Sequence, residues 1–286
     1  MLFVDFMASR SLLVVDADPA VHAFVAGFLQ RQDREIQTVF DGGEALERLR
    51  TAPCDLLLAG QGRNGFNGLN LLRRARAIRP ATKVILAGEA GPAPVLEAIR
   101  ERAWSYFHKP LPENPLADMV QQALDSPSRT WGEDIRLLSA RPEWVALDIR
   151  CKLEAADRAT QFLKEIHADL PVGVREDAAA AFRELLLNAI EHGAKSDARK
   201  RGRASFIRTS RSLIVHVADP GAGFSFDFLP HAAVSNPADA PIRHVEIRAE
   251  HGQRPGGFGI LMARNMVDEL IYNERGNAVL FVKYLK

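Results

Sequence analysis

The sequence is poor in cysteine and lacks a long apolar run. Its 286 residues include two cysteines, Cys54 and Cys151, which lie in different halves of the chain without metal-type spacing. This scarcity argues against a disulfide framework, and a reducing cytoplasm is the expected location. No apolar run approaches the roughly 18 residues that a membrane span needs. Residues 1–19 lack the basic start of a signal peptide, so we expect no membrane association.

An excess of charge of one sign is also missing. The net charge is +1, so no overall field favours nucleic acid. Hydrophobic residues make up 47% of the chain and charged residues 26%, which is ordinary for a globular protein, and the length favours two domains. The basic segment 195–203, "KSDARKRGR", precedes no helix-turn-helix pattern. We interpret it as a solvated loop and expect no DNA binding.

What the chain does have, over residues 1–125, is a regular alternation of apolar runs and helical patterns. Strands alternating with helices of 10 to 15 residues indicate βαβ units around a parallel sheet. We therefore predict an α/β, doubly wound (βα)5 domain over residues 1–125. The expected strands are 11–16, 36–40, 55–60, 83–88 and 104–109.

The remaining residues predict a linker and a second α/β domain. Residues 126–143 hold two prolines and mixed charge, and we interpret them as a linker with one short helical turn at 133–138. Residues 144–286 form the second domain, with a long irregular segment at about 224–255. Its expected strands are 144–153, 203–210, 212–220 and 278–285, and its expected helices cover 155–168, 175–195 and the apolar stretch to residue 270 that follows Gly259.

The helix predicted at 175–195 has two distinct faces. Its core stripe follows helical spacing and consists of Phe182, Leu185, Leu186, Ala189 and Ile190. Glu184 and Asn188, four residues apart, share the opposite face. A carboxylate base beside an amide oxygen suits proton abstraction next to Mg²⁺. Taken alone, such a pair is more typical of a solvated polar face.

Two glycine-rich turns follow this helix. The predicted strand 212–220 ends in Asp219, Gly221 and Gly223, and "PGGFGI" places Gly257 and Gly259 before an apolar helix. A carboxylate at a strand end can accept from an exocyclic amine, and glycines let the backbone approach a flat ring. Glycines at a helix N-terminus can cradle phosphate. In this order, the three motifs predict a nucleotide site.

The segments "ELLLNAIEHG", "DPGAGF" and "GGFGI" resemble the N, G1 and G2 boxes of GHKL ATP-binding domains over about residues 144–286. Without a phosphoacceptor helical hairpin, the segment is most similar to anti-sigma-factor serine kinases. The resemblance implies a two-layer Bergerat fold that binds ATP and Mg²⁺. His167 lies 21 residues before Asn188, too close for such a hairpin, and is interpreted as a helix-end histidine. Glu191 stands where sensor kinases often carry Lys or Arg.

The resemblance also implies roles for single residues. Glu184 is the general base, Asn188 the Mg²⁺ ligand and Asp219 the acceptor for the adenine amino group. Gly221 and Gly223 would shape the adenine pocket, Gly257 and Gly259 would cradle phosphates, and residues 224–255 would form the ATP lid, with Arg254 as a phosphate contact.

These roles imply a protein serine/threonine kinase whose partner is an antagonist protein. The alternative is a non-catalytic, ATP-gated adaptor that sequesters a sigma factor or another regulator. Similar kinases often pair through the ATP domain, and residues 144–153 could contribute an edge strand to a homodimer.

Residues 10–125 resemble a two-component receiver, through "LLVVDADP" and "YFHKPL". Receiver chemistry requires an acidic pair, an acceptor aspartate, a hydroxyl and a lysine. In this alignment Gly60 replaces the acceptor, Ala87 replaces the hydroxyl, and Asp16, Asp18 and Lys109 remain. We expect no phosphate uptake at residue 60. The domain would then either dock a protein partner or persist as a packed remnant that stabilises the chain.

Overall fold

The computed structural model describes residues 10–30, 34–60, 67–127, 131–141, 143–223 and 259–285. The chain divides into two compact units, Met1–Glu133 and Asp134–Lys286. None of the described helices is both long enough and apolar enough to cross a membrane.

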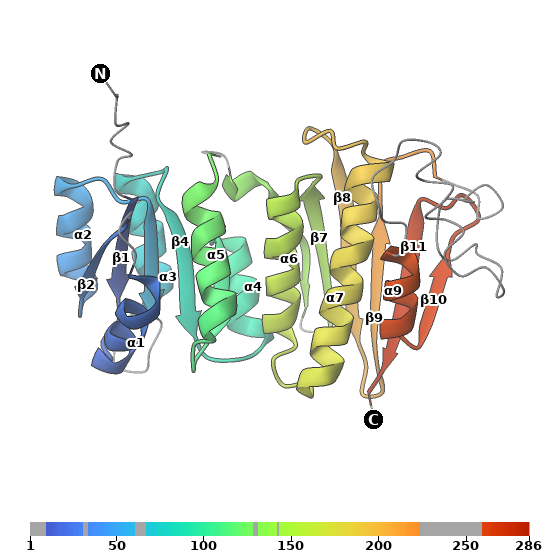
Figure 1. Cartoon of the computed structure of the whole chain (residues 1–286), viewed down its shortest axis with the longest axis horizontal. Coiled ribbons are helices and arrows are strands. Elements are labelled where there is room, and N and C mark those ends of the chain that lie inside the picture. The colour runs from blue at the N-terminus through green and yellow to red at the C-terminus, as the bar shows by residue number, and fades with distance from the viewer. Residues whose placement is uncertain are drawn as a thin grey trace, which may run out of the picture. The chain divides into compact units, whose positions relative to one another are not determined.

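The first unit contains a five-stranded parallel sheet with strand order β2-β1-β3-β4-β5 (Figure 1). This is the predicted doubly wound fold, with a helix after each strand. Its strands are β1 (Arg10–Val15), β2 (Arg34–Val39), β3 (Leu56–Gly60), β4 (Lys83–Gly88) and β5 (Ser105–His108). Its helices are α1 (Pro19–Leu29), α2 (Gly42–Thr51), α3 (Gly68–Ile78), α4 (Pro92–Arg100) and α5 (Glu113–Asp125).

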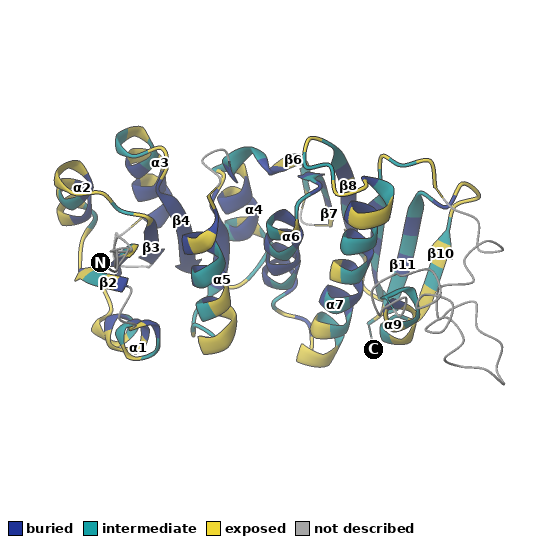
Figure 2. Cartoon of the chain, turned by 45° about the horizontal axis from the view of Figure 1, so that its top comes forward, coloured by how far each residue is buried: buried dark blue, intermediate teal, exposed yellow. Residues whose placement is uncertain are grey.

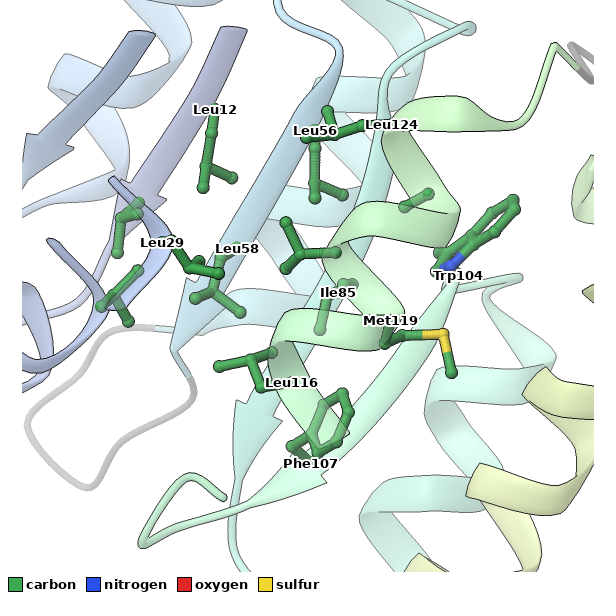
Figure 3. Close-up of a cluster of buried hydrophobic side chains, with 14 of the residues drawn as sticks. Leu12, Leu29, Leu56, Leu58, Ile85, Trp104, Phe107, Leu116, Met119 and Leu124 are labelled. Carbon is green, nitrogen blue, oxygen red and sulfur yellow. The ribbon is translucent and has the colours of Figure 1, made fainter. Parts of the chain in front are cut away.

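The core of the first unit explains why its central strands read as continuous apolar runs. Every residue of β3 and β4 is buried, as Figure 2 shows in dark blue, because helices cover both faces of a parallel sheet. Leu58, Ile85 and Phe107 of the sheet pack with Leu116 and Met119 of α5 (Figure 3). Burial of such side chains stabilises a fold by roughly 1.5–3 kcal/mol each.

The second unit contains a six-stranded antiparallel sheet with strand order β10-β11-β9-β8-β7-β6. Its helices lie on one side of this sheet (Figure 1). The strands are β6 (Ile135–Arg141), β7 (Trp144–Arg150), β8 (Arg201–Arg208), β9 (Ser212–Ala218), β10 (Glu269–Tyr272) and β11 (Ala278–Tyr284). The helices are α6 (Leu153–Ile166), α7 (Val172–Asn188) and α9 (Gly259–Met266), and a π-helical turn, η2 (Ala189–Gly193), continues α7.

Residues 135–141 correct the linker prediction. They form strand β6, paired antiparallel with β7, where a linker with a helical turn was expected. A register shift between Leu137 and Ser139 interrupts the period-two pattern, which is why the sequence did not read as a strand. The pairing also places β7 between β6 and β8, so residues 144–150 do not form the expected edge strand.

The expected helix extended to residue 270, but residues 269 and 270 instead begin strand β10. Helix α9 ends at Met266, and the Asp268 N–H donates to the Val282 carbonyl oxygen at 3.0 Å, which starts pairing with β11. A four-residue strand next to a helix carries too little periodicity to be recognised in the sequence.

Candidate functional site

Helix α7 presents its polar pair to the first turn of α9. The predicted core stripe is buried, with no member of it more than 7% exposed, and this orients the half-buried Glu184 and Asn188 away from the core. A Cβ added at Gly259 would lie 3.0 Å from Glu184 Oε2 and 3.5 Å from both Asn188 Oδ1 and Nδ2. The structure therefore brings Glu184, Asn188 and Gly259 together, from segments separated by more than 70 residues.

The amide of Asn188 has an unmet hydrogen-bonding requirement. Its Nδ2 is buried and has no hydrogen-bond partner among the described residues. Leaving a buried polar atom without a partner costs about 1–3 kcal/mol. Because the N and O of an amide are interchangeable by rotation, the group can present either atom to a ligand. This orphaned amide beside a helix N-terminus fits a group that carries a cation and phosphates.

The π-helical turn η2 carries the chain from α7 to Asp219. The Ala194 N–H donates to the Ala189 carbonyl oxygen at 2.8 Å and closes the turn. A Cβ added at Gly193 would lie 2.3 Å from Cγ of Asp219, so only glycine permits this approach. Gly193 is a functional position that was not predicted from the sequence. It ends the motif "ELLLNAIEHG", which was the available signal.

Asp219 lies half-buried at the end of β9. Its Oδ1 accepts from the Gly221 N–H at 2.6 Å, and no described residue donates a hydrogen bond to Oδ2. Burial raises the pKa of Asp219, while the Gly221 N–H and Arg275 oppose the shift. Burial, with the nearby charge of Asp219, also raises the pKa of Cys151 to about 11. Asp219 thus keeps one carboxylate oxygen, Oδ2, without a hydrogen-bond donor among the described residues.

The turn between β10 and β11 supports the glycine loop after Asp219. Asn277 Nδ2 donates to the Gly221 carbonyl oxygen at 3.3 Å, and Arg275 Nε donates to the Ala222 carbonyl oxygen at 3.1 Å. Gly223 has φ +86°, and a Cβ there would lie 1.8 Å from the Arg275 carbonyl oxygen. Arg275 and Asn277 were not predicted as site residues, because their only sequence signal is the turn-forming "NERGN".

Other predicted residues of the second unit fall elsewhere. Gly257, Arg254 and the proposed lid 224–255 lie outside the described residues. His167 follows α6 and is 2% exposed, which agrees with a helix-end histidine. The basic segment 195–203 leads into β8, and Arg199 and Arg201 form ion pairs with Asp197 and Asp148.

In the first unit, Gly60 ends β3 beside the carboxylate of Asp16. A Cβ added at Gly60 would lie 2.0 Å from Asp16 Oδ2, and this same oxygen forms an ion pair with Lys109 Nζ at 2.5 Å. Asp16 is 4% exposed. The carboxylate of Asp16 therefore occupies the space that a side chain at residue 60 would need.

The other receiver positions are also placed by the structure. Ala87 pairs with Gly60 in the parallel ladder between β3 and β4, so it lies next to residue 60. Asp18 is the N-cap of α1, where its Oδ1 accepts from the Ala20 N–H at 2.9 Å. Its carboxylate thus has a structural role at a helix terminus.

Family models match both units. Residues 12–121 match the response regulator receiver domain, and residues 149–283 match the histidine kinase-like ATPase domain.

Two curated transcriptional regulators are similar to part of the chain. The transcriptional regulator NtrC of Azospirillum brasilense is 26% identical over 121 residues, which cover 42% of this chain and 25% of that protein. The C4-dicarboxylate transport regulator DctD of Pseudomonas aeruginosa is 27% identical over 128 residues, which cover 43% of this chain and 27% of that protein. The chain spans about a quarter of the length of these relatives.

Solved receiver structures are similar as well. A CheY-like receiver from Methanospirillum hungatei JF-1 is 23% identical, with TM-score 0.39, over 41% of this chain and 95% of that chain. The BeF3-activated DrrB receiver is 24% identical, with TM-score 0.38, over 41% of this chain and 98% of that chain. Taken with the parallel sheet of the first unit and the site of the second, the family matches show that this chain fuses a receiver domain to a histidine kinase-like ATPase domain.

Proposed function

We propose that the chain is a signalling regulator that uses its ATPase-type unit as a protein serine/threonine kinase of the anti-sigma type. The observation that supports this most is the convergence of Glu184 and Asn188 on Gly259. A carboxylate, an orphaned amide and a helix N-terminus are the groups needed to accept a proton and hold phosphates.

Each residue has a chemical task in this proposal. ATP supplies the γ-phosphoryl group, which would pass to the serine or threonine oxygen while ADP leaves. Asp219 accepts a hydrogen bond from the adenine amino group at Oδ2, since its Oδ1 is already engaged by Gly221. Asn188 offers its amide oxygen to Mg²⁺. Glu184 accepts the proton of a serine or threonine hydroxyl of the antagonist protein, which makes that oxygen the nucleophile.

The proposal is tested by separating binding from transfer. The full chain is incubated with γ-labelled ATP, Mg²⁺ and antagonist proteins recovered from the native cell. Glu184→Ala should abolish labelling of the antagonist and leave the Kd for ATP within about threefold, because a positioned base contributes roughly 10²–10⁴-fold to rate. Glu191→Ala, at an exposed position of the adjoining turn, is the matched control.

Retained labelling in Glu184→Ala would refute the assignment of the base. Nucleotide binding by the wild-type chain without any labelled product would instead identify the ATP-gated adaptor that sequesters a sigma factor or another regulator.

The receiver is proposed to act without phosphate, as a docking domain for a protein partner. Glycine offers no oxygen nucleophile, and the carboxylate of Asp16 fills the adjoining space. Incubation with acetyl phosphate should leave residues 10–125 without an alkali-labile acyl phosphate. A labile phosphate on any of these residues would contradict the proposal.

A further inference from the structure

The turn that joins β10 to β11 is bonded to the loop that follows β9. We call residues 273–277 the clasp turn and residues 219–223 the glycine loop. The Asp219 N–H donates to the Asn277 carbonyl oxygen at 2.9 Å, and Asn277 Nδ2 donates to the Gly221 carbonyl oxygen. These two bonds hold the first half of the glycine loop against the clasp turn.

Arg275 holds the second half of the glycine loop. Its Nε donates to the Ala222 carbonyl oxygen, and Gly223 lies so close to the Arg275 backbone that a side chain there would collide with it. Ordering a loop costs roughly 1–2 kcal/mol of conformational entropy per residue, and glycines lose the most freedom. Because the clasp turn already orders the glycine loop in the folded chain, a ligand does not have to supply this free energy.

The clasp turn is itself fixed by Asn273. Its Oδ1 accepts from the N–H groups of Asn277 and Ala278 at 3.1 Å each, and its Nδ2 donates to Asn277 Oδ1 at 3.0 Å. Because Oδ1 of Asn277 is engaged in this way, the Nδ2 of the same amide faces Gly221. Gly276 has φ +73°, a backbone conformation that favours glycine, and its N–H donates to the Asn273 carbonyl oxygen at 2.9 Å. The turn therefore keeps its form through its own hydrogen bonds.

Arg275 also places a positive charge beside the carboxylate of Asp219. Burial raises the pKa of Asp219, and the Gly221 N–H and the charge of Arg275 oppose this shift. Two other titratable side chains face Asp219, Cys151 after β7 and Tyr272 of β10, and burial, followed by the charge of Asp219, raises the pKa of both. Both are therefore neutral at pH 7, and η2 meets Asp219 through a glycine. Among the described residues, Arg275 is thus the side chain whose charge favours the ionised form of Asp219.

We propose that Arg275 is a positioning residue for the nucleotide. Its hydrogen bond keeps the glycine loop in the form that presents Asp219 Oδ2 to the adenine amino group. Its charge keeps that carboxylate ionised, and an ionised acceptor forms the stronger hydrogen bond. The inference rests on the proposed placement of adenine at Asp219, but it does not depend on phosphoryl transfer.

A purely structural role for Arg275 predicts a different outcome. The side chain is exposed, and one hydrogen bond of this kind contributes only about 0.5–1.5 kcal/mol to stability. Its structural loss would weaken ATP binding by the same factor at every pH. Loss of the charge instead raises the pKa of Asp219 further, so that protonation of this carboxylate, and with it weaker binding, begins at a higher pH than in the parent chain.

The experiment measures the Kd of the full chain for ATP with Mg²⁺ by calorimetry between pH 5 and 8. Arg275→Met should raise the Kd about 2- to 10-fold at pH 8, because it removes one hydrogen bond from the glycine loop. As the pH falls, the Kd of this variant should begin to increase at a higher pH than that of the parent. Protonation of ATP itself affects both chains equally, so the difference between the two profiles reports on the protein.

Two further variants separate the hydrogen bond from the charge. Asn277→Ala removes a neutral bond to the glycine loop, so it should weaken ATP binding about 2- to 10-fold without moving the pH profile. Arg275→Lys keeps the charge and should return the profile to that of the parent. Arg211→Met is the matched control, because Arg211 is an exposed arginine in the turn at the opposite end of β9 from Asp219, and it should change neither the Kd nor the profile.

An Arg275→Met chain with the Kd of the parent, or with a Kd raised equally at every pH, would overturn the proposal. An Arg275→Lys profile that follows that of Arg275→Met would do the same. A parent chain that does not bind ATP would overturn it together with the placement of adenine. A parent chain that binds ATP but labels no antagonist would refute only the kinase activity, and the pH profiles would still decide the role of Arg275.

Discussion

Acidification should destabilise the second unit through His167. The side chain is 2% exposed, and neither ring nitrogen has a hydrogen-bond partner among the described residues. Burial, together with the nearby charge of Arg208, lowers the pKa of His167 to about 4 from 6.5. Between pH 6.5 and about 4, the histidine is therefore protonated in the unfolded chain and neutral in the folded chain. Stability falls as pH decreases through this window.

The size of the effect follows from the two pKa values. Lowering the pH from 7 to 5 should reduce the free energy of unfolding by about 2 kcal/mol, and lowering it to 4 by about 3 kcal/mol. The Asp169–Arg208 ion pair adds little in this window, because that pair lowers the pKa of Asp169 from an ordinary value of 3.8. Protonation of Asp169, and with it the loss of this ion pair's contribution to the free energy of unfolding, begins only near pH 4.

The assay must report on the second unit alone. Cys151 is 4% exposed there, and in a Cys54→Ala background its reaction with a dithiodipyridine in urea measures the unfolding of that unit at acid pH. His167→Leu removes the titrating group at similar volume. Between pH 7 and 5, the free energy of unfolding of this variant should therefore fall by about 2 kcal/mol less than that of the parent. His192→Gln, at an exposed position, should follow the parent. Parallel profiles for the parent and His167→Leu would refute the reasoning.

Three further changes probe the two sites. Asp219→Asn retains an acceptor for the Gly221 N–H but should weaken ATP binding roughly 10- to 100-fold in calorimetry, since it loses a charged acceptor; an unchanged Kd would place adenine elsewhere. Gly193→Ala should abolish ATP binding and lower the free energy of unfolding in urea by about 1–3 kcal/mol. Gly173→Ala is the control: an added Cβ there has nothing within 4 Å, so ATP binding should be retained and the free energy of unfolding should change by no more than about 1 kcal/mol. Gly60→Asp should lower the Tm of the first unit without restoring acyl phosphate, because its side chain meets Asp16; a labile phosphate at residue 60 would contradict this.

The two units carry their chemistry unequally. In the first, an internal ion pair between Asp16 and Lys109 satisfies the charges that remain beside residue 60. In the second, Asn188 Nδ2 and Asp219 Oδ2 are left without described partners. Each of these two atoms belongs to a side chain that packs closely against a glycine, Gly259 for Asn188 and Gly193 for Asp219. Polar atoms without partners beside such glycines indicate a ligand site, and here the site lies in the ATPase-type unit.

The sequence by itself was sufficient to predict what depends on local patterns. Local patterns predicted three features: the alternation of strands and helices in the first unit, the amphipathic stripe of α7 and the order of the glycine motifs. Each pattern can be recognised from residues that are close together in the sequence. The parallel fold and the ATPase-type second domain were confirmed on this basis. Two strands were not predicted. In β6 a register shift interrupts the period-two alternation, and β10, with four residues, is too short to show it.

Only the tertiary structure decided which distant residues meet. Three close contacts join residues that are far apart in the sequence, and no local pattern encodes them. They are Gly193 with Asp219, Gly259 with Glu184 and Gly60 with Asp16, separated by 26, 75 and 44 residues respectively. Residues 141 and 269 stand at the same level of the six-stranded sheet for the same reason, because strand order and register decide which residues lie side by side. The residue types could be read from the chain, whereas their proximity had to come from the fold.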